Sequence, residues 1–287
     1  MMRIAVTGAA GRLGRALVSQ LGSLGDVRSW SRPEYDLDDP DASSRIRADA
    51  PDLVVHSAAW TDVDACARQP ELAMRRNGEA VAEIARACRS AGSRFVLVST
   101  NEVFGGDALG TGYRPHDPVR PRNPYGASKL KGERSAQYAY ADRPEALLIV
   151  RTAWLYGPPG NDFPAKIVAA ALRARESGRP LQLVRDETGS PSVTADVARG
   201  IAQLINGQAH GIRHVVNSGQ ATRAEWATEV LRAAEIDVVT ELVPASTWPR
   251  DSTPPLWGVL ASDVELRPWQ EATRDYVAAS LVAAARG

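Results

Sequence analysis

The stretch that decides the fold stands at the start of the chain: Ile4-Ala5-Val6-Thr7-Gly8-Ala9-Ala10-Gly11-Arg12-Leu13-Gly14. An apolar run is followed by glycines at every third position and then by a segment with helical periodicity. Glycines at such a turn let the backbone approach a pyrophosphate, which the free N–H groups of a helix N-terminus can bind. The pattern predicts the first strand, turn and helix of a dinucleotide-binding fold.

The alternation of short apolar runs and helical segments continues through the first half of the chain. Runs such as Leu53-Val54-Val55 are continuously apolar, which is typical of strands covered on both faces. We expect strands at 4–6, 27–30, 53–56, 95–99 and 147–151, and helices at 12–21, 42–50, 78–91 and 125–141. This order predicts an α/β fold, a Rossmann-type doubly wound parallel sheet, over residues 1–155.

The pattern loosens after the loop Gly157-Pro158-Pro159-Gly160. Residues 156–287 are expected to form a smaller mixed α/β substrate-binding region, one of whose strands can return to the main sheet. The predicted helices there are 163–175, 193–205, 222–234 and 270–285, and the predicted strands are 181–184 and 213–216.

Composition restricts the class of protein. The 287 residues include 34 basic and 34 acidic side chains, so no net charge favours nucleic acid or an anionic membrane. Two cysteines are too few for a disulfide framework, and the four histidines form no metal-ligand spacing with them. No apolar run approaches the roughly 20 residues of a membrane span. We expect a cytoplasmic protein without a signal peptide, a metal site, a membrane partner or a nucleic-acid partner.

A second motif, Tyr125-Gly126-Ala127-Ser128-Lys129, opens a predicted helix. Residues four apart share one helix face, so the phenol and the ammonium can serve one site. Only three of the 34 basic residues are lysines, and arginine cannot replace lysine where a compact charge is needed. The hydroxyls of Ser99-Thr100 follow the fourth strand. This set and the glycine turn resemble the short-chain dehydrogenase/reductase superfamily.

Longer stretches are similar to the dTDP-4-dehydrorhamnose reductases, an extended branch of that superfamily. The matching segments are 56–64, 99–106, 123–133, 151–157 and 186–191. The resemblance implies reduction of the 4-keto group of a nucleotide-linked 6-deoxyhexulose, with NADP(H) preferred and NAD(H) possible. A homodimer is a possible assembly.

The resemblance also implies roles for individual residues. Tyr125 would donate the proton to the developing C4 alkoxide, Lys129 would hold the nicotinamide ribose and lower the pKa of Tyr125, and Thr100 would hydrogen-bond the ketone oxygen. The cofactor-binding residues would be Gly8, Ala10, Gly11, Arg12, Leu13, Gly14, Ser31, Arg32, Asp36, Leu37, Ser57, Ala58, Ala59, Tyr125 and Lys129. The substrate-binding residues would be Thr61, Val63, Asp64, Asn101, Glu102, Val103 and Trp154. Trp154 would stack on the sugar, with ordinary core packing as the alternative.

The cofactor preference rests on the end of the second strand. NAD-preferring Rossmann proteins place an acidic residue there, whereas this strand ends in Ser31-Arg32, which can accommodate and bind a 2′-phosphate. The alternatives are that Arg32 is a solvated loop residue and that Asp36 reaches the ribose.

Two departures from the reductase pattern matter. Asn101-Glu102 replaces Asp-Tyr and half-resembles the Asp-Glu of nucleotide-sugar dehydratases, but an amide cannot serve as the acid. Because Glu102 lies two residues after Thr100, an extended segment would place both side chains on one face. The segment 254–260 lacks the arginine and serine of the reductases, which leaves recognition of thymidine diphosphate open.

Two other functions remain open at this point. One is an epimerase or dehydratase with bound NAD, which Asn101 and the short chain disfavour. The other is a non-catalytic regulatory subunit like that of methionine adenosyltransferase, which the intact set of Thr100, Tyr125 and Lys129 disfavours.

Overall fold

The computed structural model of the chain describes residues 1–107 and 110–282. Its centre is a six-stranded sheet of order β10-β5-β4-β3-β1-β2, in which every pair of neighbours is parallel. The strands are β1 (Met2–Thr7), β2 (Gly25–Trp30), β3 (Leu53–His56), β4 (Arg94–Thr100), β5 (Leu147–Thr152) and β10 (Gly211–His214). The predicted Rossmann-type doubly wound sheet is confirmed.

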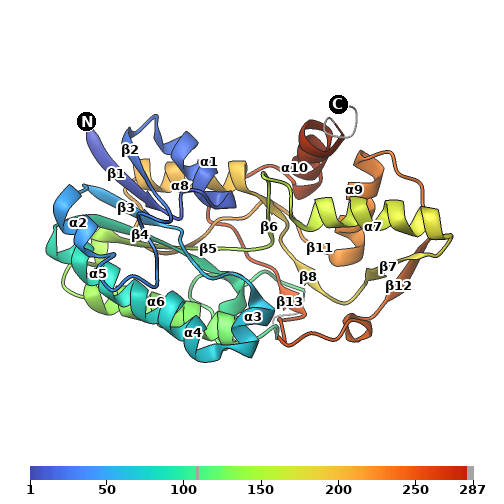
Figure 1. The fold of residues 1–287 in the computed structure, drawn as a ribbon, viewed down its shortest axis with the longest axis horizontal. Helices are drawn as coiled ribbons and strands as arrows, with labels where there is room; N and C mark the ends of the chain where they lie inside the picture. Colours follow the sequence, from blue (N-terminus) through green and yellow to red (C-terminus); the bar gives the residue numbers. More distant parts are fainter. Residues whose placement is uncertain (108–109, 283–287) are drawn as a thin grey trace.

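Helices cover both faces of this sheet (Figure 1). Helices α1 (Arg12–Leu21) and α8 (Thr194–Asn206) pack on one face, and α2 (Ser44–Asp49), α5 (Ala80–Ser90) and α6 (Pro124–Ala139) pack on the other. Successive strand residues serve the two layers alternately: Ile4 and Val6 belong to the first core, and Ala5 to the second. Burial on both faces explains why these strands are continuously apolar.

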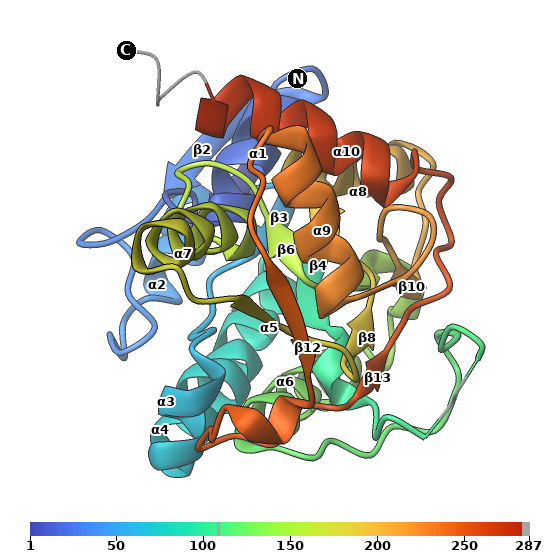
Figure 2. The same ribbon diagram turned by 90° about the vertical axis from the view of Figure 1, so that its right-hand side faces the viewer.

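The second half of the chain contributes to two parts of the molecule. Its α8 and β10 join the sheet layers, and β10 pairs with the edge strand β5. The helices α7 (Phe163–Ser177) and α9 (Arg223–Ala233) lie with the pair β7 (Leu181–Val184) and β12 (Thr240–Val243) at the far end of the molecule (Figures 1 and 2). A domain boundary at residue 155 therefore stays a prediction.

Short elements connect these parts. They are β6 (Leu155–Tyr156), β8 (Thr188–Gly189), β9 (Ser192–Val193), β11 (Ala221–Thr222), β13 (Trp257–Gly258), and the single turns η2 (Asn101–Val103), η3 (Pro144–Ala146) and η4 (Ala245–Thr247). Each pairs or turns over two or three residues, which is too short for a periodic pattern to predict.

The helical segments differ from expectation at two places. Between β3 and α5 the chain forms α3 (Val63–Arg68), α4 (Pro70–Met74) and the π-turn η1 (Arg75–Glu79), which the sequence pattern did not predict. The last helix is α10 (Trp269–Tyr276), continued by the π-turn η5 (Val277–Val282), and its predicted end at 283–285 lies outside the described residues. Within those residues, no helix is both long and apolar enough to cross a bilayer.

Candidate active site

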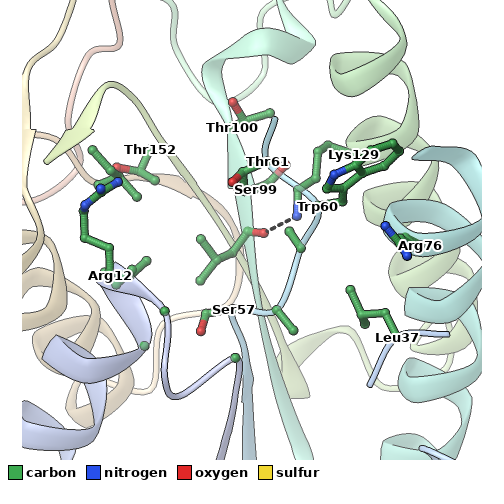
Figure 3. Close-up of a pocket in the computed structure, with 18 of the residues that line it drawn as sticks. Arg12, Leu37, Ser57, Trp60, Thr61, Arg76, Ser99, Thr100, Lys129 and Thr152 are labelled. Carbon is green, nitrogen blue, oxygen red and sulfur yellow. Dashed lines mark hydrogen bonds between the residues drawn. The ribbon is translucent and has the colours of Figure 1, made fainter. Parts of the chain in front are cut away.

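A cavity of about 890 Å³ opens at the carboxyl ends of β1, β3, β4 and β5. The chain continues from β1 to β2 on one side of the sheet and from β3 to β4 on the other. The cavity therefore lies at the point where the strand order reverses, which is where open α/β sheets usually bind ligands. Figure 3 shows Arg12 from α1 on one side, Arg76 and Leu37 on the other, and Ser57 between them.

The predicted phosphate-binding turn forms one wall of the cavity. Gly8 has φ +67°, and a Cβ on it would lie 2.8 Å from the backbone of Ala58. A Cβ on Gly14 would lie 2.1 Å from the carbonyl oxygen of Gly8, so only glycine fits there. Helix α1 begins after Gly11 with no side chain capping its first N–H groups. These donors and the bare backbone fit the pyrophosphate of a dinucleotide.

The segment after β3 forms the floor beside this turn. The Ser57 hydroxyl donates to the carbonyl oxygen of Thr7 (2.6 Å), and the Ala58 N–H donates to the Thr7 hydroxyl (3.3 Å). Ala59 and Thr61 also line the cavity. The ends of β1 and β3 are thereby held together under the site.

The residues predicted for the adenosine end also reach the cavity. Its lining there includes Ser31, Arg32, Asp36 and Leu37. The cavity lining also includes three residues that the sequence patterns did not single out, namely Tyr35, Arg76 and Trp60, the last of which packs with Tyr125. Arg76 forms a bidentate ion pair with Asp38, and its guanidinium carbon lies 5.1 Å from the ring centre of Trp60.

The predicted proton donor and its partners meet at the opposite end of the cavity. Tyr125 is in the first turn of α6, where Pro124 is the first helical residue and the Asn123 side chain caps the helix by accepting from Gly126 N–H (2.8 Å). Tyr125 is 9% exposed, and the hydroxyl of Thr100, at the end of β4, is close enough to act on the pKa of its phenol. The structure therefore brings these two hydroxyls together from distant parts of the chain.

The expected lowering of the Tyr125 pKa is not seen in this structure. Burial raises the pKa of the Tyr125 phenol, the carboxylate of Glu102 raises it further, and the Thr100 hydrogen bond opposes both. Lys129 is not among the groups that shift it. Desolvation of the phenolate is the largest effect on the Tyr125 pKa in this structure, and the lowering by Lys129 stays a prediction.

Lys129 lies one helical turn after Tyr125 and points to the sheet. Its Nζ donates to the carbonyl oxygen of Val98 on β4 (2.8 Å), as Figure 3 shows. Burial lowers the pKa of Lys129 to about 8, and Glu133 acts in the opposite direction. The ammonium is therefore buried and bonded to one backbone acceptor, and the negative charge of Glu133 partly offsets the effect of burial on its pKa.

Glu102 lines the cavity for a different reason from the one expected. Residues 101–103 form the turn η2, so Thr100 and Glu102 do not share the face of an extended segment. The Glu102 carboxylate instead accepts from Asn123 Nδ2 (2.7 Å), and burial raises its pKa. Asn101 is buried, and its Nδ2 donates to the carbonyl oxygen of Gly258 (3.2 Å). An amide committed in this way cannot act as an acid.

Trp154 both lines the cavity and packs against the core, so the two expected roles are compatible. It stacks on Trp226 with ring centres 5.7 Å apart, and the Arg223 guanidinium carbon lies 3.5 Å from its ring centre. Its φ of 42° and the close approach of Gly189 fix the ring in place.

Two residues predicted to bind substrate lie elsewhere. Val103 is fully buried in a hydrophobic cluster with Phe104 and Tyr113. Asp64 accepts from the backbone N–H of Ser252 (3.1 Å) and from its hydroxyl, so it ties α3 to the segment before β13. Val63 does line the cavity. Lining residues that the sequence did not indicate also include Thr152, Pro159 and Asn161, whereas Ser99, which the sequence did indicate, lines the cavity beside Thr100. Within residues 1–107 and 110–282, no three His, Cys, Asp or Glu side chains gather as metal ligands would.

The fold and this cavity define an oxidoreductase of the short-chain dehydrogenase/reductase class. The family model described as RmlD substrate binding domain matches residues 2–281, and the chain belongs to that family. A dTDP-4-dehydrorhamnose reductase of Mycolicibacterium smegmatis is 34% identical over 297 residues, covering 99% of this chain and 88% of the relative.

Two further similarities bear on the site. A probable dTDP-4,6-dihydroxy-2-methyloxan-3-one 4-ketoreductase of Streptomyces antibioticus is 35% identical and covers 96% of this chain and 94% of its own. The crystal structure of dTDP-4-dehydrorhamnose reductase from Bacillus anthracis in complex with NADP has a TM-score of 0.87 at 27% identity, covering 96% of this chain and 98% of that one. The family resemblance expected from the sequence motifs is confirmed.

Proposed function

We propose that this chain is an NADP(H)-dependent reductase of the 4-keto group of a nucleotide-linked 6-deoxyhexulose. The observation that carries the proposal is that Thr100, Tyr125 and Lys129 together line one end of a cavity whose other end is the glycine cradle. The names of the relatives support it, since they are reductases of dTDP-linked keto sugars and one structure contains NADP.

The cofactor would be held along the length of the cavity. Gly8, Gly11 and the first N–H groups of α1 would bind its pyrophosphate, and Ser31 and Arg32 its 2′-phosphate. Lys129 would hold the nicotinamide ribose. When bound, NADPH supplies the hydride that reduces the ketone carbon.

The protein's own residues would handle the oxygen of that ketone. Thr100 donates a hydrogen bond to the oxygen, and Tyr125 transfers its proton to it as negative charge develops. The ordinary pKa of a phenol is about 10 and burial raises that of Tyr125 further, so the donor is protonated at neutral pH before the reaction begins. Stabilisation of the resulting phenolate by the Lys129 ammonium stays a prediction of the resemblance, because Lys129 is not among the groups that shift the Tyr125 pKa in this structure.

A second cavity supports a substrate that carries phosphate. It has a volume of about 340 Å³ and is lined by Phe163, Lys166, Ile167, Gln182, Leu183, Val184, Arg223 and Arg250. Glu187 pairs with both arginines, at 3.3 Å and 2.8 Å, so one carboxylate balances two of the three cations that line this cavity. Arg223 also stacks on Trp154, which lines the first cavity, and so connects the two. We infer that the diphosphate lies here, and that Arg250 serves in place of the arginine absent from segment 254–260.

The test is the oxidation of NADPH, followed at 340 nm, with a panel of 4-keto sugar nucleotides. Stoichiometric consumption of NADPH with one of them is expected, and the corresponding free keto sugar should react poorly because it lacks the diphosphate. Product formation without net change in NADPH would identify an epimerase or dehydratase instead. Binding of NADPH without turnover of any substrate would identify a regulatory subunit.

Glu102 should affect substrate affinity more than the chemical step. In Glu102→Gln the side chain keeps its shape but loses the charge that faces the sugar end of the cavity. We expect a several-fold change in KM and a change in kcat below about tenfold, measured with the substrate that the panel identifies. A loss of kcat comparable to that of a catalytic acid would show that Glu102 takes part in proton transfer.

A further inference from the structure

A buried ion pair lies directly behind the proposed catalytic helix. Glu133 is one turn after Lys129 on α6, and Arg151 is near the end of β5; their side chains are 1% and 2% exposed. Arg151 donates to both carboxylate oxygens of Glu133, at 2.9 Å and 2.7 Å, and the Ser99 hydroxyl donates to one of them at 2.5 Å. A further guanidinium nitrogen of Arg151 donates to the carbonyl oxygen of Pro115 (3.0 Å). The carboxylate is thus paired on both oxygens without access to water.

This pair fixes the register between α6 and the strand that carries Thr100. Lys129 bonds the carbonyl of Val98, Glu133 bonds the side chain of Ser99, and Thr100 is the next residue of the same strand. Ser99 is also the partner of Arg151 in the ladder between β4 and β5. Two successive turns of the helix are therefore attached to two successive residues of the strand.

The pair also contributes to the charge balance around Lys129. Glu133 on α6 acts on the charge of Lys129, and Lys129 acts on His56 of β3. Of the other charged or titratable groups nearby, Tyr125 on α6, Glu102 after β4 and Arg76 on η1 line the same cavity as Lys129, and Arg151 on β5 pairs with Glu133. Burial lowers the pKa of His56 to about 3, so its ring is neutral. Glu133 is the group that counters the effect of burial on the Lys129 ammonium.

We propose that Glu133, held by Arg151 and Ser99, is a positioning residue that seats the Lys129 ammonium against Val98 and keeps it charged. The proposal rests on the proposed function, in which Lys129 serves cofactor and phenol as a cation. It assigns a role to a residue that lines neither cavity and that the resemblance left without one.

The direction of the expected effect follows from the sign of the charge. An ammonium is present below its pKa and lost above it, and removing a nearby carboxylate lowers that pKa. In Glu133→Gln, the amide oxygen can still accept from Ser99 and Arg151, but the charge is gone. We expect the alkaline limb of the kcat/KM profile to move to lower pH by about one unit. The pH dependence of NADPH affinity, measured by fluorescence, should move in the same direction.

A matched control separates this effect from loss of stability. The buried Asp196 forms an ion pair with the partly exposed Arg267 at 2.7 Å and lines neither cavity. Asp196→Asn should lower the thermal midpoint and leave both pH profiles in place. If both pH profiles of Glu133→Gln stay in place and its thermal midpoint falls as much as that of Asp196→Asn, Glu133 has only a structural role.

A second variant keeps the proposal testable if Glu133→Gln does not fold. If Glu133→Gln does not fold, the double variant Glu133→Gln with Arg151→Met removes both charges, and a smaller shift in the same direction is expected. An unshifted NADPH-binding profile in the double variant would overturn the proposal. If wild-type protein binds NADPH but reduces no substrate of the panel, the proposed function fails, while the binding profiles still decide the role of Glu133.

Discussion

Replacement of Tyr125 by phenylalanine is expected to lower kcat by about 10²–10⁴-fold, the usual contribution of a positioned acid. The change removes one oxygen atom and leaves the ring among Cys66, Ala73 and Trp60, which pack around it. Helix α6 keeps its cap, because Asn123 bonds the backbone and not the phenol. The loss should therefore appear in turnover and not in NADPH affinity or thermal stability.

Tyr138 offers a matched control on the same helix, since its side chain is 84% exposed. Tyr138→Phe should retain wild-type turnover. The measurement is the steady-state rate of NADPH oxidation with the identified keto sugar nucleotide, together with NADPH binding by fluorescence. A Tyr125→Phe protein as active as the Tyr138→Phe protein would show that another group donates the proton.

Local patterns were sufficient to predict the strands of the sheet in the first half of the chain, though not α3, α4 and η1. The glycine turn can be located from the sequence because the backbone around Gly8 and Gly14 leaves no room for a side chain. The requirement for glycine is therefore visible in a short stretch of sequence. The strands of the sheet are buried on both faces, so each is visible as a short apolar run. The Tyr125–Lys129 pair is likewise a matter of helical spacing.

The rest of the site depends on contacts between distant segments. The second cavity joins Lys166 of α7, Arg223 of α9 and Arg250, and no spacing in the sequence indicates that these three cations converge. Arg76 reaches the first cavity from the π-turn η1, which has no apolar pattern of its own. In both cases the charge alone is uninformative, because arginine is common throughout this chain.

The residues around Glu102 show a second reason why the sequence alone does not predict the geometry of the site. Sequence reasoning placed Glu102 near Thr100 by assuming that the strand continued, whereas the chain turns after Thr100, whose hydroxyl accepts the N–H of Glu102 (3.2 Å). A threonine that caps the following turn is a local device. What places the carboxylate in the site is its bond to Asn123, 21 residues later in the chain. The predicted location was correct, but the structural reason was not.

Replacement of Arg32 by alanine should weaken NADPH binding by roughly ten- to a hundredfold and leave NADH binding nearly unchanged. The structure places Arg32 and Ser31 on the cavity wall directly after β2, where a 2′-phosphate of the adenosine ribose is expected. A charge-assisted hydrogen bond contributes about 1.5–3 kcal/mol, which corresponds to this range. The nearest competing carboxylate along the chain that lines the cavity is Asp36, and Asp38 is already paired with Arg76.

Arg28 is the matched control for this prediction, because it is a half-exposed arginine of β2 that pairs with Asp49 (3.1 Å) and does not line the cavity. Arg28→Ala should bind both cofactors as the wild type does, with dissociation constants measured by the fluorescence of the reduced nicotinamide. Loss of the Arg32 guanidinium should lower the affinity only for NADPH, which carries the 2′-phosphate. NADH offers the guanidinium no charged partner at that position. Equal weakening of NADPH and NADH in Arg32→Ala, or a wild-type preference for NADH, would instead assign the ribose contact to Asp36.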